Sequence, residues 1–371
     1  MKILQLSSAR TLGGGERHFA DLANALAARG HEVYAALRPA SPLAEKLTGL
    51  PASRVFRLPL RNALDVPSAL ALARLVRARG IEIVHAHLAR DYPLASLAAR
   101  DARRARLVVT RHVPFPMSAL HRLTLSNVAR VVAVSGGVAR GLSERRIFPA
   151  AKIRVVPNGV SMGAYDLALR DFDREAYRAA LPARARLLVG AVGELSEVKG
   201  QEDLVRAAAA VARRGALDAA FLVVGEDNSQ GRAVRRRLEW MIADEGLAGR
   251  VRLLGYVSDL VPFLAALDLY VSPSRAEAFG LATVEAMACG ACVVATDTDG
   301  TREIVTHGET GRVVPVCDPD SLAAEIAALL EDEGGRRRLA ERGRASVRER
   351  FSLERMVEST EEVYREALSA G

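Results

Sequence analysis

The sequence predicts an α/β protein with two facing Rossmann-like domains, each built on a doubly wound parallel sheet, and a cleft between the domains. Three observations support this prediction. Short β-branched, apolar runs alternate with stretches rich in Ala, Leu and Arg, which is the pattern of strands and helices in turn. The alternation occurs in both halves of the chain. A chain of 371 residues, half of them hydrophobic, is long enough for two domains with separate cores.

The expected strands are short. In the first half they are "KILQL", "HEVYAAL", "IEIVHAH", "LVVT", "VVAV" and "IRVV", and in the second half "LLVGAV", "FLVVG", "VRLLG", "LDLYVS" and "ACVVAT". Most of these runs are continuously apolar, which is typical of parallel strands covered on both faces. Because parallel strands end at one edge of a sheet, ligand-binding residues are expected in the loops just after the strands.

The rhythm is interrupted near residues 158–186, where Gly, Pro and charged residues replace the apolar runs. This stretch predicts a hinge, with one domain over 1–165 and another over 166–351. The last stretch, 352–371, has apolar residues at helical spacing and predicts an amphipathic helix. Its expected apolar positions are Leu353, Met356 or Val357, Val363, Tyr364, Ala367 and Leu368.

Composition excludes several classes of protein. No apolar run approaches the roughly 20 residues that span a bilayer, and "MKILQL" is too short for a signal-peptide core, so a cytoplasmic protein is expected. Cys289 and Cys292 form a C-x2-C pair in the small, apolar stretch "MACGACVVAT", with no second pair to complete a metal site. We expect buried, reduced thiols, with a redox or zinc role as the alternative.

The net charge of +8 is unevenly distributed. Residues 1–165 carry 25 Lys and Arg against 9 Asp and Glu, whereas residues 166–371 carry 27 against 35. A basic first half favours an anionic membrane surface or a phosphorylated acceptor, with a merely solvated arginine-rich surface as the alternative. Nucleic acid is not an expected partner, because the basic residues are not interleaved with aromatic ones and no binding motif occurs.

A glycine-rich turn, "SSARTLGGGERHF", follows the first expected strand and opens a helix. Main-chain amides at such a turn hold an anion or let a ligand come close, although a tight turn without a ligand is the alternative. A dinucleotide fingerprint would need Gly13, Gly15 and a third glycine at position 18, which is histidine here. Nicotinamide binding is therefore not expected.

A second glycine-rich loop, "VGELSEVKGQEDLV", follows the first strand of the second half. It contains Lys199, one of only four lysines against 48 arginines. A compact ammonium group near a helix start suits a phosphate, and a solvated loop charge is the alternative.

The stretch "SRAEAFGLATVEAMACGA" carries two glutamates eight positions apart. Glu277 is expected in the loop after a strand, and Glu285 within the first turns of a helix that begins near Gly280. Exposed amides near Phe279 and Gly280 would attract a phosphate, and carboxylates beside it would bind sugar hydroxyls. The alternative is a solvated loop charge and a glutamate favoured by the helix dipole.

On these motifs the chain resembles the retaining, metal-independent nucleotide-sugar glycosyltransferases of the GT-B fold, in particular family 4. The resemblance extends over nearly the whole chain. Its stretches are "EAFGLATVEAMACG", "GGGERHFADLANALAARGHEV", "VHAH", "TRHV", "VVAVS", "VVPNGV", "VKG" and "DTDGTREIV". It implies that the last helix packs back onto the first domain, which takes the acceptor, while the second domain takes the nucleotide sugar.

The resemblance also assigns roles to residues. Glu277 resembles the glutamate that contacts the donor sugar, and Lys199 the lysine that neutralises the diphosphate. His112 resembles the histidine near the transferred sugar, so these three are the expected catalytic residues. The expected donor-binding residues are Glu285 for the ribose, the amides of Phe279 and Gly280, Gly193 and Glu194 in the second loop, and Gly14 and Gly15 in the first.

One departure from the family pattern concerns Glu194, because family members commonly carry Arg there. A carboxylate beside a diphosphate would repel it by on the order of a few kcal/mol in a partly desolvated cleft. Either the side chain points away and another arginine substitutes, or donor binding is weakened. A catalytically weak nucleotide-sugar sensor or partner subunit is therefore the alternative function.

The chemistry follows from the leaving group. Breaking the anomeric bond builds negative charge on the diphosphate, which Lys199 and helix amino ends can stabilise without a metal. Asp297 and Asp299 form a D-x-D pair that could instead hold a divalent cation, and the two glutamates could serve a glycosidase. His85 and His87 could face the acceptor or be structural.

The expected function is transfer of a hexose-type sugar from a nucleotide sugar, with UDP favoured and GDP second. The acceptor is a glycan or lipid-linked molecule of lipopolysaccharide or cell-surface polysaccharide synthesis. No cofactor and no metal are expected. The expected location is the cytoplasm, with peripheral association at the inner face of the membrane.

Overall fold

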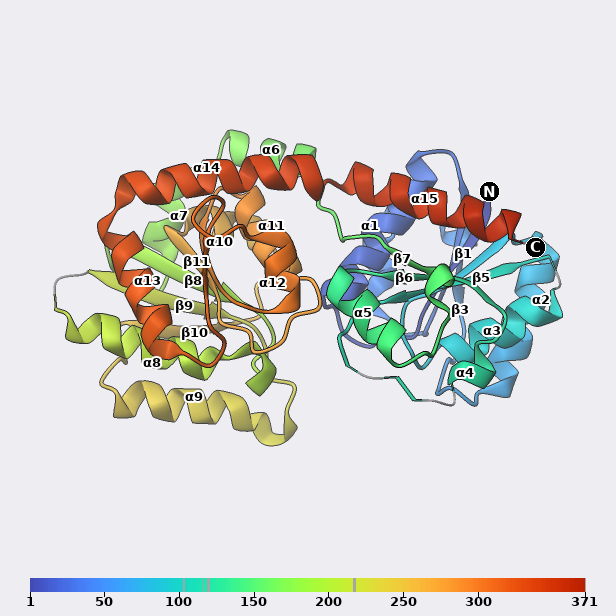
Figure 1. Cartoon of the computed structure of the whole chain (residues 1–371), viewed down its shortest axis with the longest axis horizontal. Coiled ribbons are helices and arrows are strands. Elements are labelled where there is room, and N and C mark those ends of the chain that lie inside the picture. Colours follow the sequence, from blue (N-terminus) through green and yellow to red (C-terminus); the bar gives the residue numbers. More distant parts are fainter. Residues whose placement is uncertain (103, 116, 119–120, 216–217, 371) are drawn as a thin grey trace. The chain divides into compact units, whose positions relative to one another are not determined.

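The computed structural model describes residues 1–102, 104–115, 117–118, 121–215 and 218–370, and it divides the chain into two compact units. Unit 1 comprises Met1–Gly159 and Leu353–Gly371, and unit 2 comprises Val160–Ser352 (Figure 1). The boundary falls after Gly159, earlier than the expected 165. The reason is that α6 (Met162–Arg170) packs against α10 (Leu260–Ala266) within unit 2.

Unit 1 is built on a seven-stranded sheet in the order β3-β2-β1-β4-β5-β6-β7, and every pair of neighbouring strands is parallel. The chain therefore winds outward in both directions from the neighbours β1 and β4. The strands are β1 (Lys2–Ser7), β2 (Glu32–Leu37), β3 (Val55–Arg57), β4 (Ile83–Ala86), β5 (Arg106–Arg111), β6 (Val128–Ala133) and β7 (Ile153–Val155).

The helices of unit 1 cover this sheet. Within it, α2 packs against α3, while α15 packs beside α1 and contacts β5 and β6. Buried residues of α15, including Met356, Val357, Val363 and Ala367, belong to the same apolar core as Ile3 in β1. The helices are α1 (Gly14–Ala28), α2 (Val66–Arg79), α3 (Tyr92–Asp101), α4 (His121–Thr124), α5 (Gly136–Glu144) and α15 (Leu353–Ser369).

Unit 2 repeats the plan with a six-stranded parallel sheet in the order β10-β9-β8-β11-β12-β13. Here the central neighbours are β8 and β11. The strands are β8 (Leu187–Val192), β9 (Ala219–Val224), β10 (Val251–Gly255), β11 (Leu269–Ser272), β12 (Cys292–Thr296) and β13 (Arg312–Val314).

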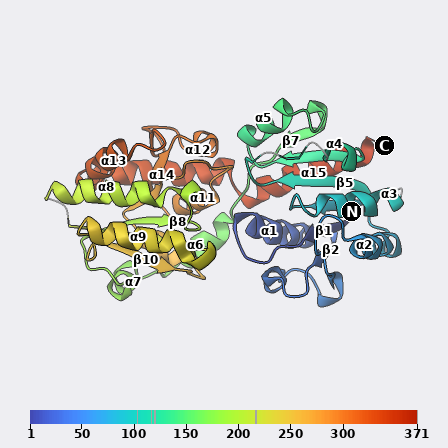
Figure 2. The same cartoon turned by 90° about the horizontal axis from the view of Figure 1, so that it is seen from below.

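Helices of unit 2 pack on one another as well as on the sheet. α8 and α13 lie side by side (Figure 2), α13 also contacts α14, and α10 and α14 both contact α11. Besides α6 and α10, the helices are α7 (Arg174–Ala180), α8 (Gln201–Arg213), α9 (Ala233–Asp244), α11 (Leu281–Ala288), α12 (Asp299–Ile304), α13 (Pro319–Glu331) and α14 (Glu333–Arg350). Short 3₁₀ turns in the chain are Pro42–Lys46, Ala52–Arg54, Ala150–Lys152, Glu197–Lys199 and Gln230–Arg232.

Helix ends follow local chemistry. The N-cap of α2 is Asp65, whose carboxylate accepts a hydrogen bond from the Ser68 amide at 3.2 Å. Its C-cap is Gly80, with a φ of 64°, a left-handed conformation that glycine adopts without strain. Asp318 caps α13 in the same way through the Ser321 amide. These caps fix where the two helices begin and where α2 ends.

The two sheets confirm the predicted fold class. In a doubly wound sheet, ligands bind beyond the carboxyl ends of the strands at the point where the winding reverses. That point lies at β1 and β4 in unit 1 and at β8 and β11 in unit 2. The loops after β1, β8 and β11 lead into Gly14, Lys199 and Glu277, whereas His112 lies in the loop after β5, the neighbour of β4.

Among the described residues, the helices include none with the length and apolar character needed to cross a bilayer.

Cys289 and Cys292 are buried free thiols, and burial raises the pKa of each to about 12. Both are therefore protonated at neutral pH, which suits structural thiols better than reactive ones.

Candidate active site

Lys199 lies at the end of a 3₁₀ turn in the loop between β8 and α8. The next residue, Gly200, has a φ of 65°, and a Cβ there would collide with the carbonyl oxygen of Pro273. Glycine thus lets the start of α8 lie directly against the end of β11. This close approach brings the loop of Lys199 beside the loop of Glu277.

The ammonium group of Lys199 and the carboxylate of Glu277 form an ion pair with an Nζ–Oε2 distance of 2.5 Å. Ser274 Oγ also lies 3.4 Å from the same carboxylate oxygen and donates to it. The Lys199 and Glu277 side chains are 30% and 17% exposed, so both are accessible to a ligand from solvent. Two opposite charges are thereby held together at the point where the winding of the sheet reverses.

The main chain around Glu277 is held by Gly300 at the start of α12. The Gly300 amide donates to the Glu277 carbonyl oxygen at 3.1 Å, and a Cβ on Gly300 would collide with the Phe279 carbonyl oxygen. The Phe279 ring is buried and lies 5.6 Å from the Phe351 ring. Gly280, with a φ of 105°, then turns the chain into α11. The loop is therefore a rigid support for its carboxylate.

Glu285 lies in the second turn of α11 and is 4% exposed. Burial, together with the negative charges of Glu277 and Glu285, raises the pKa of the Tyr270 phenol in β11. Glu277 follows β11 and Glu285 lies in the helix after it, as expected from the sequence.

The loop after β8 is packed against the loop after β9. A Cβ on Gly225 would collide with the Gly193 carbonyl oxygen, and the methylene chain of Lys199 lies along Gly193, with Cδ 3.5 Å from the position a Cβ would take. The Glu194 carboxylate accepts a hydrogen bond of 3.0 Å from Asn228 Nδ2. Its side chain is thus directed toward the loop after β9, where the amide partly balances its charge.

The D-x-D pair is occupied by an arginine. Arg302 donates to both carboxylate oxygens of Asp297, at 2.7 and 2.9 Å, and lies 3.7 Å from Asp299. Hydrogen bonding to Arg302 lowers the pKa of Asp297. A guanidinium group between the two carboxylates stands where a bridging cation would have to bind, which argues against a metal there.

In unit 1, Gly14 is the first residue of α1 and Gly15 the second. A Cβ on Gly15 would lie 3.4 Å from Cγ of His112, an ordinary van der Waals distance, so the helix start lies directly against the imidazole. His112 directly follows β5, and its exposure is intermediate. The glycine-rich turn and the histidine, far apart in the sequence, are therefore neighbours.

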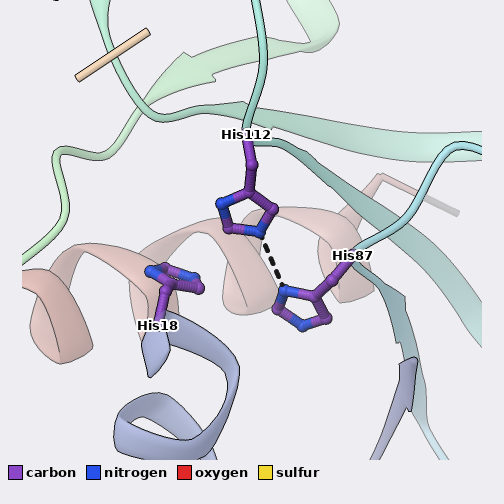
Figure 3. Close-up of side chains that lie close together, drawn as sticks. All are labelled: His18, His87 and His112. Atoms are coloured by element: carbon purple, nitrogen blue, oxygen red, sulfur yellow. Dashed lines mark hydrogen bonds between the residues drawn. The ribbon is translucent and has the colours of Figure 1, made fainter. Parts of the chain in front are cut away.

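Two further histidines lie beside His112 (Figure 3). His87 follows β4, and its Nδ1 lies 3.3 Å from His112 Nε2. His18, in α1, has its ring centroid 4.8 Å from that of His112. Burial lowers the pKa of His18 to about 4 and holds the pKa values of His87 and His112 well below their usual range. All three imidazoles are uncharged at neutral pH.

A chain of hydrogen bonds assigns the tautomers of this group. Gln5 Nε2 donates to Tyr364 Oη at 3.0 Å, which leaves Gln5 Oε1 to accept from His87 Nε2 at 2.7 Å. His87 Nδ1 then carries the lone pair and accepts from His112 Nε2. His85 is bonded at both nitrogens, to Tyr364 Oη at 2.7 Å and to Thr110 Oγ1 at 2.6 Å, and is structural. The second nitrogen of His112 is left as an acceptor.

Replacing Tyr364 with phenylalanine is expected to lower the free energy of unfolding by about 1–3 kcal/mol for each buried polar group left without a partner. The phenol is completely buried, and its loss deprives Gln5 and His85 of one hydrogen bond each. Urea unfolding of the full chain measures the effect. Tyr256→Phe, at a side chain that is 59% exposed, is the control and should change stability little. Equal stability of both variants would contradict this account of the buried network.

The structure groups the predicted residues by unit. Unit 2 gathers Gly193, Glu194, Lys199, Glu277, Phe279, Gly280 and Glu285, whereas unit 1 gathers Gly14, Gly15 and His112. Sequence reasoning missed the residues that support these groups. They are Gln5 and Tyr364 in unit 1 and Gly200, Gly225, Asn228 and Gly300 in unit 2. The glycine directly after Lys199 was the only feature of the local sequence that could have indicated one of these supporting residues. The main-chain groups that each glycine approaches are brought beside it only when the chain folds.

Comparisons with known proteins agree with this architecture. The model of "Glycosyltransferase Family 4" matches residues 12–163, and that of "Glycosyl transferases group 1" matches residues 173–346. The lipopolysaccharide core biosynthesis glycosyltransferase LpsE of Rhizobium meliloti (strain 1021) is 31% identical over 355 residues, which cover 94% of each protein. The N-acetyl-alpha-D-glucosaminyl L-malate synthase of Bacillus anthracis is 27% identical over 96% of this chain and 95% of the relative.

Among solved structures, Anabaena HepE in complex with UDP and glucose superimposes with a TM-score of 0.85, at 24% identity and over 98% of both chains. The fold is thus shared over the whole length. Two doubly wound units, the loops at their winding points and the full-length similarity to LpsE lead to one conclusion: the chain belongs to family 4 of the glycosyltransferases and has the GT-B fold.

Proposed function

We propose that this glycosyltransferase is a retaining enzyme that moves a hexose-type sugar from a nucleotide sugar to a glycan or lipid-linked acceptor without a metal. The observation that carries the proposal is the Lys199–Glu277 pair, two accessible opposite charges at the carboxyl ends of β8 and β11. A diphosphate needs a cation and a sugar needs hydrogen-bond acceptors, and the two side chains supply both at one place.

Each residue has a role in this proposal. The ammonium group of Lys199 moves partly away from the Glu277 carboxylate and binds the diphosphate. Glu277 accepts hydrogen bonds from hydroxyls of the donor sugar. Glu285 binds the ribose of the nucleotide. His112 has the role that its resemblance to the family histidine implies, which is contact with the transferred sugar.

The reaction breaks the bond between the anomeric carbon and a phosphate oxygen, and the bonding electrons stay on the diphosphate. The acceptor hydroxyl oxygen attacks the same face of the sugar and forms the new glycosidic bond, while its proton passes to the departing phosphate. Negative charge on that phosphate is larger in the transition state than in the bound donor, so a fixed ammonium group there lowers the barrier. No base from the protein is needed in this scheme.

UDP is the proposed nucleotide, which the UDP complex of the similar HepE supports. In a thermal-shift experiment with chelator present, we expect UDP to raise the melting temperature, with GDP second and ADP without effect. At a hundredfold excess over its dissociation constant, a ligand of the folded state stabilises it by about 2.7 kcal/mol. Magnesium should not enlarge the shift, and the shift should disappear in Lys199→Ala. A shift that depends on magnesium would contradict the metal-free site.

Glu194 motivates the alternative of a nucleotide-sugar-binding partner without transfer. Its bond to Asn228 directs the carboxylate to the neighbouring loop and supports an intact donor site. Incubation with UDP-hexoses and lipopolysaccharide core oligosaccharides decides between the two, because only the enzyme forms a glycosidic product. Binding of UDP without any product would favour the partner role.

The acceptor is proposed to belong to lipopolysaccharide or cell-surface polysaccharide synthesis, which the similarity to LpsE supports. We further propose that the protein is cytoplasmic and meets its acceptor at the inner face of the membrane, because residues 1–165 carry 25 basic against 9 acidic side chains. The full chain should then sediment with anionic vesicles at low salt and be released at high salt. Failure to sediment with them would contradict the membrane part of the proposal.

A further inference from the structure

Within the described part of the chain, one group of His, Cys, Asp and Glu side chains is arranged as a metal site: His18, His87 and His112. One ring nitrogen from each lies within 4.8 Å of the others. The three rings converge from α1 and from the ends of β4 and β5 (Figure 3). The D-x-D pair of unit 2, by contrast, forms ion pairs with Arg302.

The distances fit a tetrahedral ion after a small adjustment. Zinc–imidazole bonds of about 2.0–2.1 Å place two ligand nitrogens roughly 3.4 Å apart in a tetrahedron. His87 Nδ1 and His112 Nε2 are 3.3 Å apart already. The His18 nitrogen lies within 4.8 Å of the other two, so it needs to approach them by up to about 1.4 Å to complete the same geometry.

The surroundings of the histidines also resemble those of metal ligands. A ligand imidazole usually donates its second N–H to an oxygen, which fixes the free nitrogen toward the metal. His87 does so through Gln5 Oε1 at 2.7 Å, leaving Nδ1 directed at His112. His18 is 3% exposed, and the buried side chain of Asn158 lies beside it as a hydrogen-bond partner. The Asn158 carboxamide oxygen can accept from one ring N–H of His18, which leaves the other ring nitrogen for a metal.

We propose that His18, His87 and His112 form a binding site for a divalent transition-metal ion, Zn²⁺ above all, with water as the fourth ligand. Three imidazoles suit Zn²⁺, Co²⁺, Ni²⁺ and Cu²⁺, whereas Mg²⁺ and Ca²⁺ require oxygen ligands. When the metal ion binds Nε2 of His112, the proton of that nitrogen moves to Nδ1. The imidazole can then no longer contact the substrate. Zinc therefore inhibits sugar transfer, a consequence that rests on the proposed function, whereas the metal site itself does not.

The test uses Co²⁺ as a spectroscopic probe on the full chain after treatment with chelator. We expect one Co²⁺ per chain, with the visible absorption of a four-coordinate ion, and its displacement by Zn²⁺ but not by Mg²⁺. His18→Ala should weaken binding at least about 100-fold, and Gln5→Leu about 10- to 100-fold. His121→Ala, at a unit 1 histidine outside the cluster, is the matched control and should bind like the unaltered protein.

Circular dichroism and melting temperature establish that His18→Ala is folded, and His112→Ala, at the least buried of the three, provides a second ligand variant. Absence of a stoichiometric Co²⁺ spectrum, or the same affinity in His18→Ala and His121→Ala, would overturn the proposal. Because this measurement needs no nucleotide sugar, its failure is distinguishable from failure of the proposed function. In the transfer assay, Zn²⁺ should inhibit the His121→Ala enzyme reversibly and His18→Ala only at far higher concentration.

Discussion

Replacing Lys199 with alanine is expected to lower kcat/KM for sugar transfer about 100- to 1,000-fold, the usual effect of removing one group that stabilises charge in a transition state. Lys199 is the cation of the pair with Glu277, and its methylene chain is fixed along Gly193. Lys199→Arg should keep part of the activity, because arginine supplies the positive charge on a side chain of different shape.

The fold should survive this change. A partly exposed ion pair contributes at most about 1 kcal/mol to stability, and the Lys199 side chain is 30% exposed. The Arg213–Glu245 pair, with a distance of 3.1 Å, serves as a matched control in the same unit. Arg213→Ala should leave kcat/KM unchanged. Near-normal turnover of Lys199→Ala, or unfolding of this variant, would contradict the assignment of Lys199 to the active site.

Replacing Glu277 with glutamine is expected to lower kcat/KM by a similar factor, about 100-fold or more. Glutamine keeps the shape but loses the negative charge, so sugar hydroxyls lose a charged acceptor, whose hydrogen bonds are about twice as strong as neutral ones. The main chain should not move, because Gly300 and the buried Phe279 ring hold the loop.

The control for Glu277→Gln is Glu245→Gln, which removes one carboxylate from the exposed pair with Arg213. The double variant of Lys199 and Glu277 should lose less than the product of the single losses, because residues that act on one transition state are not independent. Strict multiplication of the two effects would show that the residues act separately.

The hydrogen-bond network that links His112 to Tyr364 extends the site beyond the residues proposed to contact substrate. Tyr364 was expected only as an apolar position of the last helix, yet its hydroxyl links Gln5 and His85. Through Gln5 and His87 it reaches Nε2 of His112. The last helix of the chain thus contributes to the geometry of unit 1 through chemistry that apolar periodicity does not reveal.

The sequence by itself determined the fold class and the residue types of the candidate site. Continuously apolar runs separated by helical stretches require a parallel sheet covered on both faces, and the structure contains two. Lys199 and Glu277 could be singled out because each lies in a loop after a strand, and Glu285 because it lies eight positions after Glu277 in the helix that follows. Their roles stay predictions until transfer is measured.

The tertiary structure alone decided which of these residues meet. Lys199 and Glu277 are 78 positions apart and become neighbours because the strand order places β8 beside β11. The close approach of Gly200 to Pro273, the bond from Asn228 to Glu194 and the convergence of His18, His87 and His112 depend on the same long-range packing. Local patterns record how each segment prefers to fold, but such contacts exist only once the strands have found their order in the sheet.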